Sequence, residues 1–223
     1  FDYAQTDVVV IPPYTDLRSV QTVIDADNLE IKLGAQDVAV YESGAYTGEI
    51  SATMLQKLGV SYVVVGHSER REYHQETDDL VGQKSKAVLA HDMIPIICCG
   101  EVLEVRKSGQ HVDHVVSQIE GALAGYTADD AAKIVIAYEP VWAIGTGEVA
   151  TPADAEEVCK AIRDLLKAMY NEETADAIRI LYGGSVKSSS IKELMSQPNV
   201  DGALVGGASL DADEFAKIAD YLN

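Results

Sequence analysis

The residues of this sequence best suited to chemistry are a glutamate and a histidine that each follow a run of apolar residues. Glu139 ends the run Val-Ile-Ala-Tyr and precedes Pro140. A carboxylate in an apolar setting has its charged form disfavoured, which moves its pKa toward working pH and suits a general base. For an isolated glutamate, a salt-bridged carboxylate at a strand end would be the more ordinary interpretation.

The segment after Glu139 has the composition of a lid. Residues 145–147 (Gly-Thr-Gly) lie between the stiff segments 140–142 (Pro-Val-Trp) and 151–152 (Thr-Pro). A short glycine-containing loop between rigid ends can close over a catalytic base and exclude water. This context favours Glu139 as the base of a covered active site.

A second polar group, Gly-His-Ser-Glu-Arg-Arg at 66–71, follows the run Val-Val-Val. His67 falls at the start of a predicted helix, whose positive dipole end favours neutral imidazole. Neutral imidazole can donate a hydrogen bond to a carbonyl and stabilise an enediolate. A lone histidine more often satisfies a turn, but this polar cluster after an apolar strand favours a site, in which Glu69 would orient other polar groups.

The metal-binding alternative fits the sequence poorly. His67 and Glu69 form an HxE pair, but the PCxxC motif of zinc deaminases and the HExxH motif are both absent. We therefore expect no metal. The three cysteines, two of them adjacent at Cys98 and Cys99, make no disulfide framework and no CxxC pair, which favours a reducing cytoplasm.

Composition bounds the class of protein and its partners. With 223 residues and 47% hydrophobic residues, the chain can bury the core of one α/β domain. Seventeen basic against 36 acidic residues give a formal net charge of −19, which disfavours nucleic acid and anionic membranes as partners. The apolar runs are far shorter than the roughly 20 residues that span a bilayer, and from the first residues, which include no initiator methionine, we expect no leader.

Short apolar runs alternate with segments of helical period, as in βαβ units around a parallel sheet. The clearest predicted helix has Thr151 as its N-cap and Pro152 in its first turn, and the last helix is predicted over 213–222. Seven strand-helix units result. The predicted strands are 7–11, 31–35, 62–65, 94–98, 134–138, 178–181 and 202–205.

Two architectures fit such strands, an open doubly wound sheet and a closed (β/α)8-type barrel. No GxGxxG motif follows the first predicted strand. The polar residues fall just past the carboxyl ends of several strands, which form one ring in a barrel and a line in an open sheet. The sequence therefore predicts a barrel, as a single domain over residues 1–223.

Two glycine pairs after the last two strands predict an anion site. Gly183-Gly184 precede Ser185, and Gly206-Gly207 follow the final strand. Glycines there let backbone N–H groups approach an anion, and parallel barrels commonly hold phosphate after their last two strands. Neutral dipoles would then bind an anionic ligand despite the acidic charge of the chain.

Four motifs together resemble the triosephosphate isomerase family, in its order and spacing. They are Gly-His-Ser-Glu-Arg-Arg at 66–71, Tyr-Glu-Pro-Val-Trp-Ala-Ile-Gly-Thr-Gly at 138–147, Tyr-Gly-Gly-Ser-Val at 182–186 and Val-Gly-Gly-Ala-Ser-Leu at 205–210. The stretch 44–51, Gly-Ala-Tyr-Thr-Gly-Glu-Ile-Ser, is similar to the dimer loop of the family. The likeness runs over nearly the whole chain.

The resemblance implies a TIM barrel that interconverts dihydroxyacetone phosphate and glyceraldehyde 3-phosphate in glycolysis and gluconeogenesis, without a cofactor. It implies that Glu139 is the proton-shuttling base, His67 the electrophile and Glu69 a supporting glutamate; this division between glutamate and histidine is a standard example of tuned acid-base catalysis. It implies a homodimer in which Thr47 reaches into the partner subunit, and a buried Cys98. The residues implied for the substrate phosphate are Gly145, Ser185, Gly206 and Gly207.

One departure from the family leaves alternatives open. Its first strand carries Asn-Trp-Lys-Met-Asn, whose asparagine and lysine line the active site, and this sequence contains no such motif. We expect the first strand-helix unit to be missing here, in line with seven predicted units. The chain is then an active isomerase, a catalytically silent relative or fragment that keeps the fold and phosphate cradle, or another phosphate-binding barrel enzyme.

Overall fold

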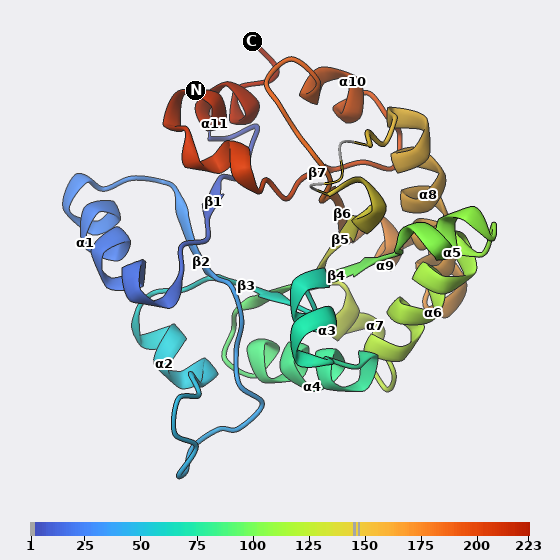
Figure 1. Ribbon diagram of the computed structural model, residues 1–223. Coiled ribbons are helices and arrows are strands. Elements are labelled where there is room, and N and C mark those ends of the chain that lie inside the picture. Colours follow the sequence, from blue (N-terminus) through green and yellow to red (C-terminus); the bar gives the residue numbers. More distant parts are fainter. Residues whose placement is uncertain (1–2, 145, 147) are drawn as a thin grey trace.

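The computed structural model describes residues 3–144, 146 and 148–223, which form a curled parallel sheet wrapped by helices (Figure 1). The strands are hydrogen-bonded to one another in chain order, and every pairing is parallel. This is the barrel-type α/β fold that the sequence predicts. The strands are β1 (Val9–Val10), β2 (Lys32–Ala35), β3 (Tyr62–Val65), β4 (Ile94–Gly100), β5 (Val135–Glu139), β6 (Arg179–Tyr182) and β7 (Gly202–Ala203).

The two outermost strands are shorter than predicted. The expected strands 7–11 and 202–205 are reduced to two residues each, β1 and β7. In the part of the chain that the structure describes, no hydrogen-bonded pairing joins β7 to β1, so each has one neighbour only. A strand that pairs along one edge has half the ladder hydrogen bonds to extend it, which accounts for the shorter span.

The strand β4 is longer than predicted, because its ladder with β5 continues to the pair Gly100 and Glu139. A Cβ atom at Gly100 would lie 1.9 Å from the carbonyl oxygen of Glu139. A glycine is therefore required where β4 passes the end of β5. The predicted end at Cys98 was wrong because the periodicity of the sequence does not register this close approach.

Helices surround the outer face of the sheet in Figure 1. The eleven α-helices of the described residues are α1 (Leu17–Asp27), α2 (Ala52–Lys57), α3 (Ser68–His74), α4 (Asp78–Leu89), α5 (Leu103–Lys107), α6 (His111–Ala122), α7 (Ala128–Ala131), α8 (Pro152–Met169), α9 (Glu172–Ala177), α10 (Ile191–Met195) and α11 (Ala212–Ala219). Three 3-10 helices join them: η1 (Tyr14–Asp16), η2 (Val141–Ala143) and η3 (Gly207–Leu210).

The helix α8 shows how the sequence sets its own boundary. The Thr151 side chain accepts a hydrogen bond from the backbone of Asp154, whose carboxylate accepts one from the Thr151 backbone, which is a capping box. Pro152 opens the helix as predicted. The C-terminal helix α11 begins one residue before the predicted 213 and ends at Ala219 rather than at 222.

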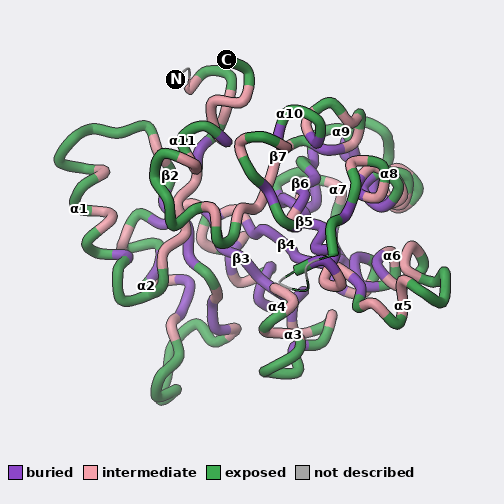
Figure 2. The backbone as a smooth tube through the Cα atoms, turned by 45° about the horizontal axis from the view of Figure 1, so that its top comes forward, coloured by how far each residue is buried: buried purple, intermediate pink, exposed green. Residues whose placement is uncertain are grey.

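The central strands are buried on both faces, which explains why they lack alternating polarity. In β3, Val63 and Val65 join the large core between the sheet and the helices, whereas Tyr62 and Val64 join a smaller core inside the curl. Figure 2 shows this burial concentrated along the middle strands. No helix among the described residues is long and apolar enough to cross a membrane.

Candidate active site

Glu139 and His67 meet at the carboxyl end of the sheet. Glu139 is the last residue of β5, and His67 follows β3 by two residues. The His67 Nε2 atom lies 2.9 Å from the Glu139 Oε1 atom. The Glu139 side chain is 1% exposed and the His67 side chain 31%, so an essentially buried carboxylate contacts a ring that reaches solvent. The structure thus brings together the two side chains that the sequence singled out.

Ser68 completes the environment of the carboxylate. Its backbone N–H donates to Glu139 Oε2 at 3.0 Å, and its hydroxyl donates to Oε1 at 2.9 Å. Together with His67, these contacts surround Glu139 with polar partners rather than with the purely apolar setting that the sequence suggested. Ser68 was not predicted as a site residue, although it lies inside the Gly-His-Ser-Glu-Arg-Arg motif.

A sharp turn aims His67 at Glu139. Gly66 has a φ of +67°, a left-handed conformation that favours glycine, and a Cβ atom there would lie 2.7 Å from Val81. The turn makes His67 the N-cap of α3, where its Nδ1 atom accepts a hydrogen bond from the Glu69 backbone N–H at 3.3 Å. Nδ1 as acceptor and Nε2 facing a carboxylate fit a neutral ring that is protonated at Nε2.

Several influences compete for the pKa of His67. Burial lowers it, whereas the hydrogen bond to Glu139 and the charges of Glu139 and Glu69 raise it, and their balance lies above the ordinary histidine value. A second proton would go to Nδ1, which would then give up the hydrogen bond from the helix N-terminus. The neutral ring therefore depends on helix α3, and the ionised ring on the carboxylate of Glu139.

Glu69 does not enter the site in this arrangement. Its side chain is 69% exposed, and its Oε2 atom lies 3.7 Å from His67 Nδ1, beyond hydrogen-bond distance. Its hydrogen bond to His67 comes from its backbone N–H, and its carboxylate acts on the ring only through its charge, which raises the pKa of His67. The role of its carboxylate stays a prediction.

A second buried carboxylate supports the segment after the base. Glu101 is fully buried, and its Oε1 atom accepts hydrogen bonds from the Tyr138 hydroxyl at 3.0 Å and from Trp142 Nε1 at 2.8 Å. Burial raises the pKa of Glu101, although these hydrogen bonds lower it in part. Its Oε2 atom has no hydrogen-bond partner among the described residues. This role of Glu101 was not predicted from the sequence.

The predicted lid starts from Trp142, which lies in the 3-10 helix η2. The Thr146 hydroxyl donates to the Trp142 carbonyl at 2.7 Å, which holds Thr146 against the start of the loop. Ile144 is 38% exposed and Val149 is 74% exposed, which leaves apolar side chains on the loop surface. The predicted phosphate contact Gly145 lies outside the described residues.

The two glycine pairs occupy neighbouring strand ends but differ in their surroundings. The Gly183 backbone N–H donates to the Tyr138 carbonyl at 2.7 Å, and its absent Cβ would lie 3.0 Å from Glu139 Cγ. This pair packs against the base. Gly206 and Gly207 have open space where a Cβ atom would stand, and Ser185 is exposed. Because no side chain or neighbouring atom fills the Cβ positions of these two glycines, a ligand can come close to the backbone here.

Two predicted residues remain, Cys98 in the buried core and Thr47 on an exposed loop. Cys98 is fully buried in β4, and burial holds the pKa of its thiol well above the usual value, which makes it a poor nucleophile. Thr47 lies in an exposed loop, residues 41–49, in which the rings of Tyr41 and Tyr46 stack with centroids 3.7 Å apart. Among the described residues, no group of His, Cys, Asp or Glu side chains is arranged to hold a metal ion.

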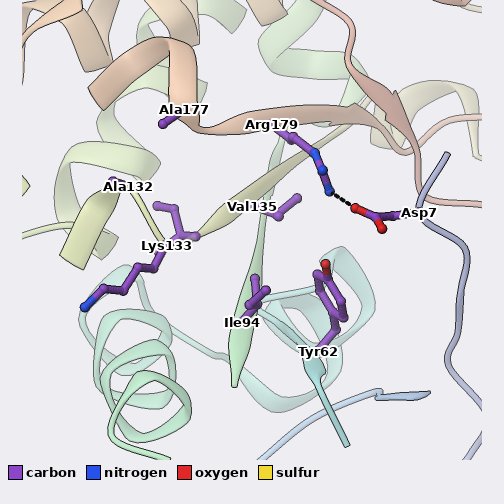
Figure 3. Close-up of a pocket in the computed structure, with 9 residues that line it drawn as sticks. Asp7, Tyr62, Ile94, Ala132, Lys133, Val135, Ala177 and Arg179 are labelled. Carbon is purple, nitrogen blue, oxygen red and sulfur yellow. Dashed lines mark ion pairs between the residues drawn. The ribbon is translucent and has the colours of Figure 1, made fainter. Parts of the chain in front are cut away.

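A cavity of about 250 Å³ lies at the opposite, amino end of the strands (Figure 3). Tyr62, Ile94, Val135 and Arg179 are the first residues of β3, β4, β5 and β6, and all four line it. Figure 3 shows Arg179 reaching across to Asp7, with 2.7 Å between Nη1 and Oδ2. This cavity was not predicted from the sequence.

Comparison with known proteins identifies the family. The family profile described as "Triosephosphate isomerase" matches residues 2–222. The chain is 61% identical over 220 residues to a triosephosphate isomerase of Streptomyces avermitilis, covering 99% of this chain and 85% of the relative. It is 63% identical over 217 residues to that of Corynebacterium efficiens (97% and 83%) and 59% identical over 221 residues to that of Cutibacterium acnes (99% and 85%). The chain belongs to the triosephosphate isomerase family.

Proposed function

We propose that this chain interconverts dihydroxyacetone phosphate and glyceraldehyde 3-phosphate by proton transfer through an enediolate. The observation that carries the proposal is the 2.9 Å contact between His67 Nε2 and Glu139 Oε1 at the carboxyl ends of β3 and β5. A carboxylate base and an imidazole donor that face one space are the two groups that proton abstraction next to a carbonyl requires.

In the proposed reaction, Glu139 removes a proton from the carbon beside the substrate carbonyl and returns it to the former carbonyl carbon. The hydroxyl proton of the enediolate moves from its own oxygen to the former carbonyl oxygen, so that the old carbonyl becomes a hydroxyl and the old hydroxyl becomes the aldehyde. The charge that builds on the carbonyl oxygen is stabilised by the Nε2–H group of His67. The three donors on Glu139 hold its carboxylate in the ligand-free site. Substrate that takes the His67 hydrogen bond frees Glu139 Oε1 from that contact.

We assign the substrate phosphate to the glycine pair after β7, with Ser185 beside it after β6. Support comes from the open space at Gly206 and Gly207 and from the neighbouring positions of β6 and β7 in the sheet. Backbone N–H groups bind a phosphate without a compensating positive charge. This mode of binding suits a chain with a formal net charge of −19. Gly145 is a further proposed phosphate contact.

We also propose closure of the loop after Glu139 over bound substrate. The exposed Ile144 and Val149 would lose water contact on closure, and Glu101 would hold the loop base through Trp142. The exposed aromatic pair at Tyr41 and Tyr46 beside Thr47 supports a homodimer built on this loop. A cytoplasmic location follows from the glycolytic reaction that we propose.

The proposal is tested by adding dihydroxyacetone phosphate to the purified chain and measuring glyceraldehyde 3-phosphate through a coupled dehydrogenase. We expect turnover that is removed by Glu139→Gln and competitively inhibited by inorganic phosphate. A folded chain that binds phosphate without turnover would instead support the silent relative. A chain that neither binds nor turns over would overturn the assignment of the site.

A further inference from the structure

Arg71 connects two strand ends at the site. Its Nε atom donates to the Gly66 carbonyl at 2.8 Å, and its Nη2 atom donates to the Cys98 carbonyl at 3.0 Å. Its Nη1 atom donates to Asp78 in α4. The side chain is 16% exposed, so all three bonds form in a largely buried setting. The fork of the guanidinium can serve all three acceptors at once.

These two carbonyls mark the point where β3 leaves the sheet. The last pair of the ladder between β3 and β4 is Val65 with Ile97, and Gly66 and Cys98 are the next residues on each strand. The chain turns at Gly66, so the ladder cannot continue. The guanidinium of Arg71 accordingly replaces the missing ladder bond and holds the two strand ends together.

His67 is bracketed by this arrangement. The Arg71 side chain holds the residue before His67, and the Arg71 backbone N–H donates to the His67 carbonyl at 3.0 Å. On the other side, Cys98 belongs to β4, which pairs with β5 up to Glu139. The position of His67 relative to Glu139 therefore depends on two sets of contacts. The first is the Arg71 connection from β3 to β4, and the second is the ladder from β4 to β5.

We infer that Arg71 is a positioning residue for the isomerisation, which fixes His67 relative to Glu139 by tying the Gly66 and Cys98 carbonyls together. The inference rests on the proposed function. Lysine at this position would keep the charge but lose the planar fork, so it cannot reproduce the same three contacts. A small displacement of a catalytic group impairs the chemical step while leaving phosphate binding intact.

The test compares Arg71→Lys with two controls, using dihydroxyacetone phosphate as substrate. Arg18→Lys changes an exposed arginine of α1. Asp78→Asn weakens the third contact but leaves both carbonyl bonds. We expect Arg71→Lys to lower kcat by about 10- to 100-fold with KM changed by no more than about twofold. Both controls should stay near the unaltered chain. An unchanged kcat in folded Arg71→Lys, or an equal loss in Asp78→Asn, overturns the inference.

A second readout separates this inference from the proposed function. The ring ¹⁵N signals of His67, identified by their loss in His67→Gln, report its hydrogen bond to Glu139. They should shift in Arg71→Lys and stay fixed in Asp78→Asn, whether or not the chain turns over substrate. If the unaltered chain is inactive, the proposed function fails while this comparison still decides the role of Arg71; unchanged ring signals in Arg71→Lys refute it.

If Arg71→Lys does not fold, the unaltered chain supplies the measurement. The Arg71 Nε–H should exchange slowly with solvent because it donates to a buried carbonyl, whereas the Nε–H of Arg18 should exchange rapidly. The signal of the Arg71 Nε–H should also move when His67 is titrated. Exchange as fast as that of Arg18, or no response to the titration, overturns the inference.

Discussion

The two ends of the same strands carry charged groups in opposite circumstances. At the carboxyl ends, Glu139 and Glu101 are at most 1% exposed, and both oxygens of Glu139 and the Oε1 atom of Glu101 accept hydrogen bonds. At the amino ends, the side chains of Asp7 and Arg179 are 40% and 53% exposed and form one ion pair beside the cavity of Figure 3. Both ends of the strands carry charged side chains, but only at the carboxyl ends are these side chains buried.

This difference in burial indicates which end of the strands is suited to catalysis. Charges exposed to solvent interact weakly and are screened by salt, whereas buried groups respond strongly to each neighbour. Tyr62 at the amino end has a raised pKa, through burial and then the charge of Asp7, but Asp7 and Arg179 beside it are exposed and paired with each other. Catalysis is therefore expected to depend on the carboxyl end alone.

The largest difference between the two ends of the strands is expected when the proposed catalytic base, Glu139, is moved. Glu139→Asp withdraws the carboxylate by one methylene while its charge remains, so the proton must cross a longer distance. We expect kcat to fall by about 10² to 10³-fold with a small change in KM, which steady-state kinetics measures directly.

Glu104→Asp is the matched control for this substitution, because Glu104 is an exposed glutamate of α5. The control should leave both constants unchanged. Equal activity in Glu139→Asp and Glu104→Asp would remove Glu139 as the base.

The next effect concerns the donor across from the base. His67→Gln keeps an N–H group near the carbonyl position but places it differently and cannot ionise. We expect kcat to fall by about 10²-fold, as for the loss of one preorganised oxyanion donor. Because the pKa of His67 is raised in the free site, the acid limb of kcat/KM should also change, which a pH series measures. An acid limb identical to that of the unaltered chain would exclude His67 as its source.

The sequence predicted these two residues because both follow apolar strands, and strand ends are fixed by burial. It also predicted the N-cap at Thr151, since a cap depends on neighbouring residues alone. It did not predict the shortness of β1 and β7, which depends on pairing partners distant in the chain. The single domain with a first unit missing relative to the family stays a prediction.

The roles of Ser68 and Glu101 were not predicted for the same reason. Ser68 contacts Glu139 across 71 positions of sequence, and Glu101 contacts Trp142 across 41. Propensity and periodicity describe the residue's own segment, whereas these contacts depend on how β3, β4 and β5 are registered. The Arg71 fork is a further example, since its acceptors are backbone carbonyls that no side-chain pattern marks.

At Glu101 we expect the burial of a carboxylate at the carboxyl ends to affect the free energy of unfolding rather than activity. Its folded pKa is raised, so the folded chain holds this proton more tightly than the unfolded chain, and the free energy of unfolding falls as pH rises through that interval. Glu101→Gln removes the titration and keeps an oxygen for Tyr138 and Trp142. We expect it to match the unaltered chain at acid pH and to be more stable by about 1 kcal/mol above the raised pKa. Urea unfolding across pH measures this, with exposed Glu104→Gln as control, and a pH-independent difference would contradict it.

The smallest effect is expected at the amino end. Arg179→Met removes the exposed ion pair with Asp7, which should cost at most about 1 kcal/mol of unfolding free energy, and less at high salt. The isomerase constants should stay unchanged, because Arg179 lies at the opposite end of β6 from the Gly183 turn that packs on Glu139. Urea unfolding at low and high salt, with kinetics on the same samples, measures both. Since β6 connects this arginine to that turn, a kcat loss in Arg179→Met as large as that in His67→Gln would mean that the strand transmits displacement along its length, and the two ends would then have to be treated as one site.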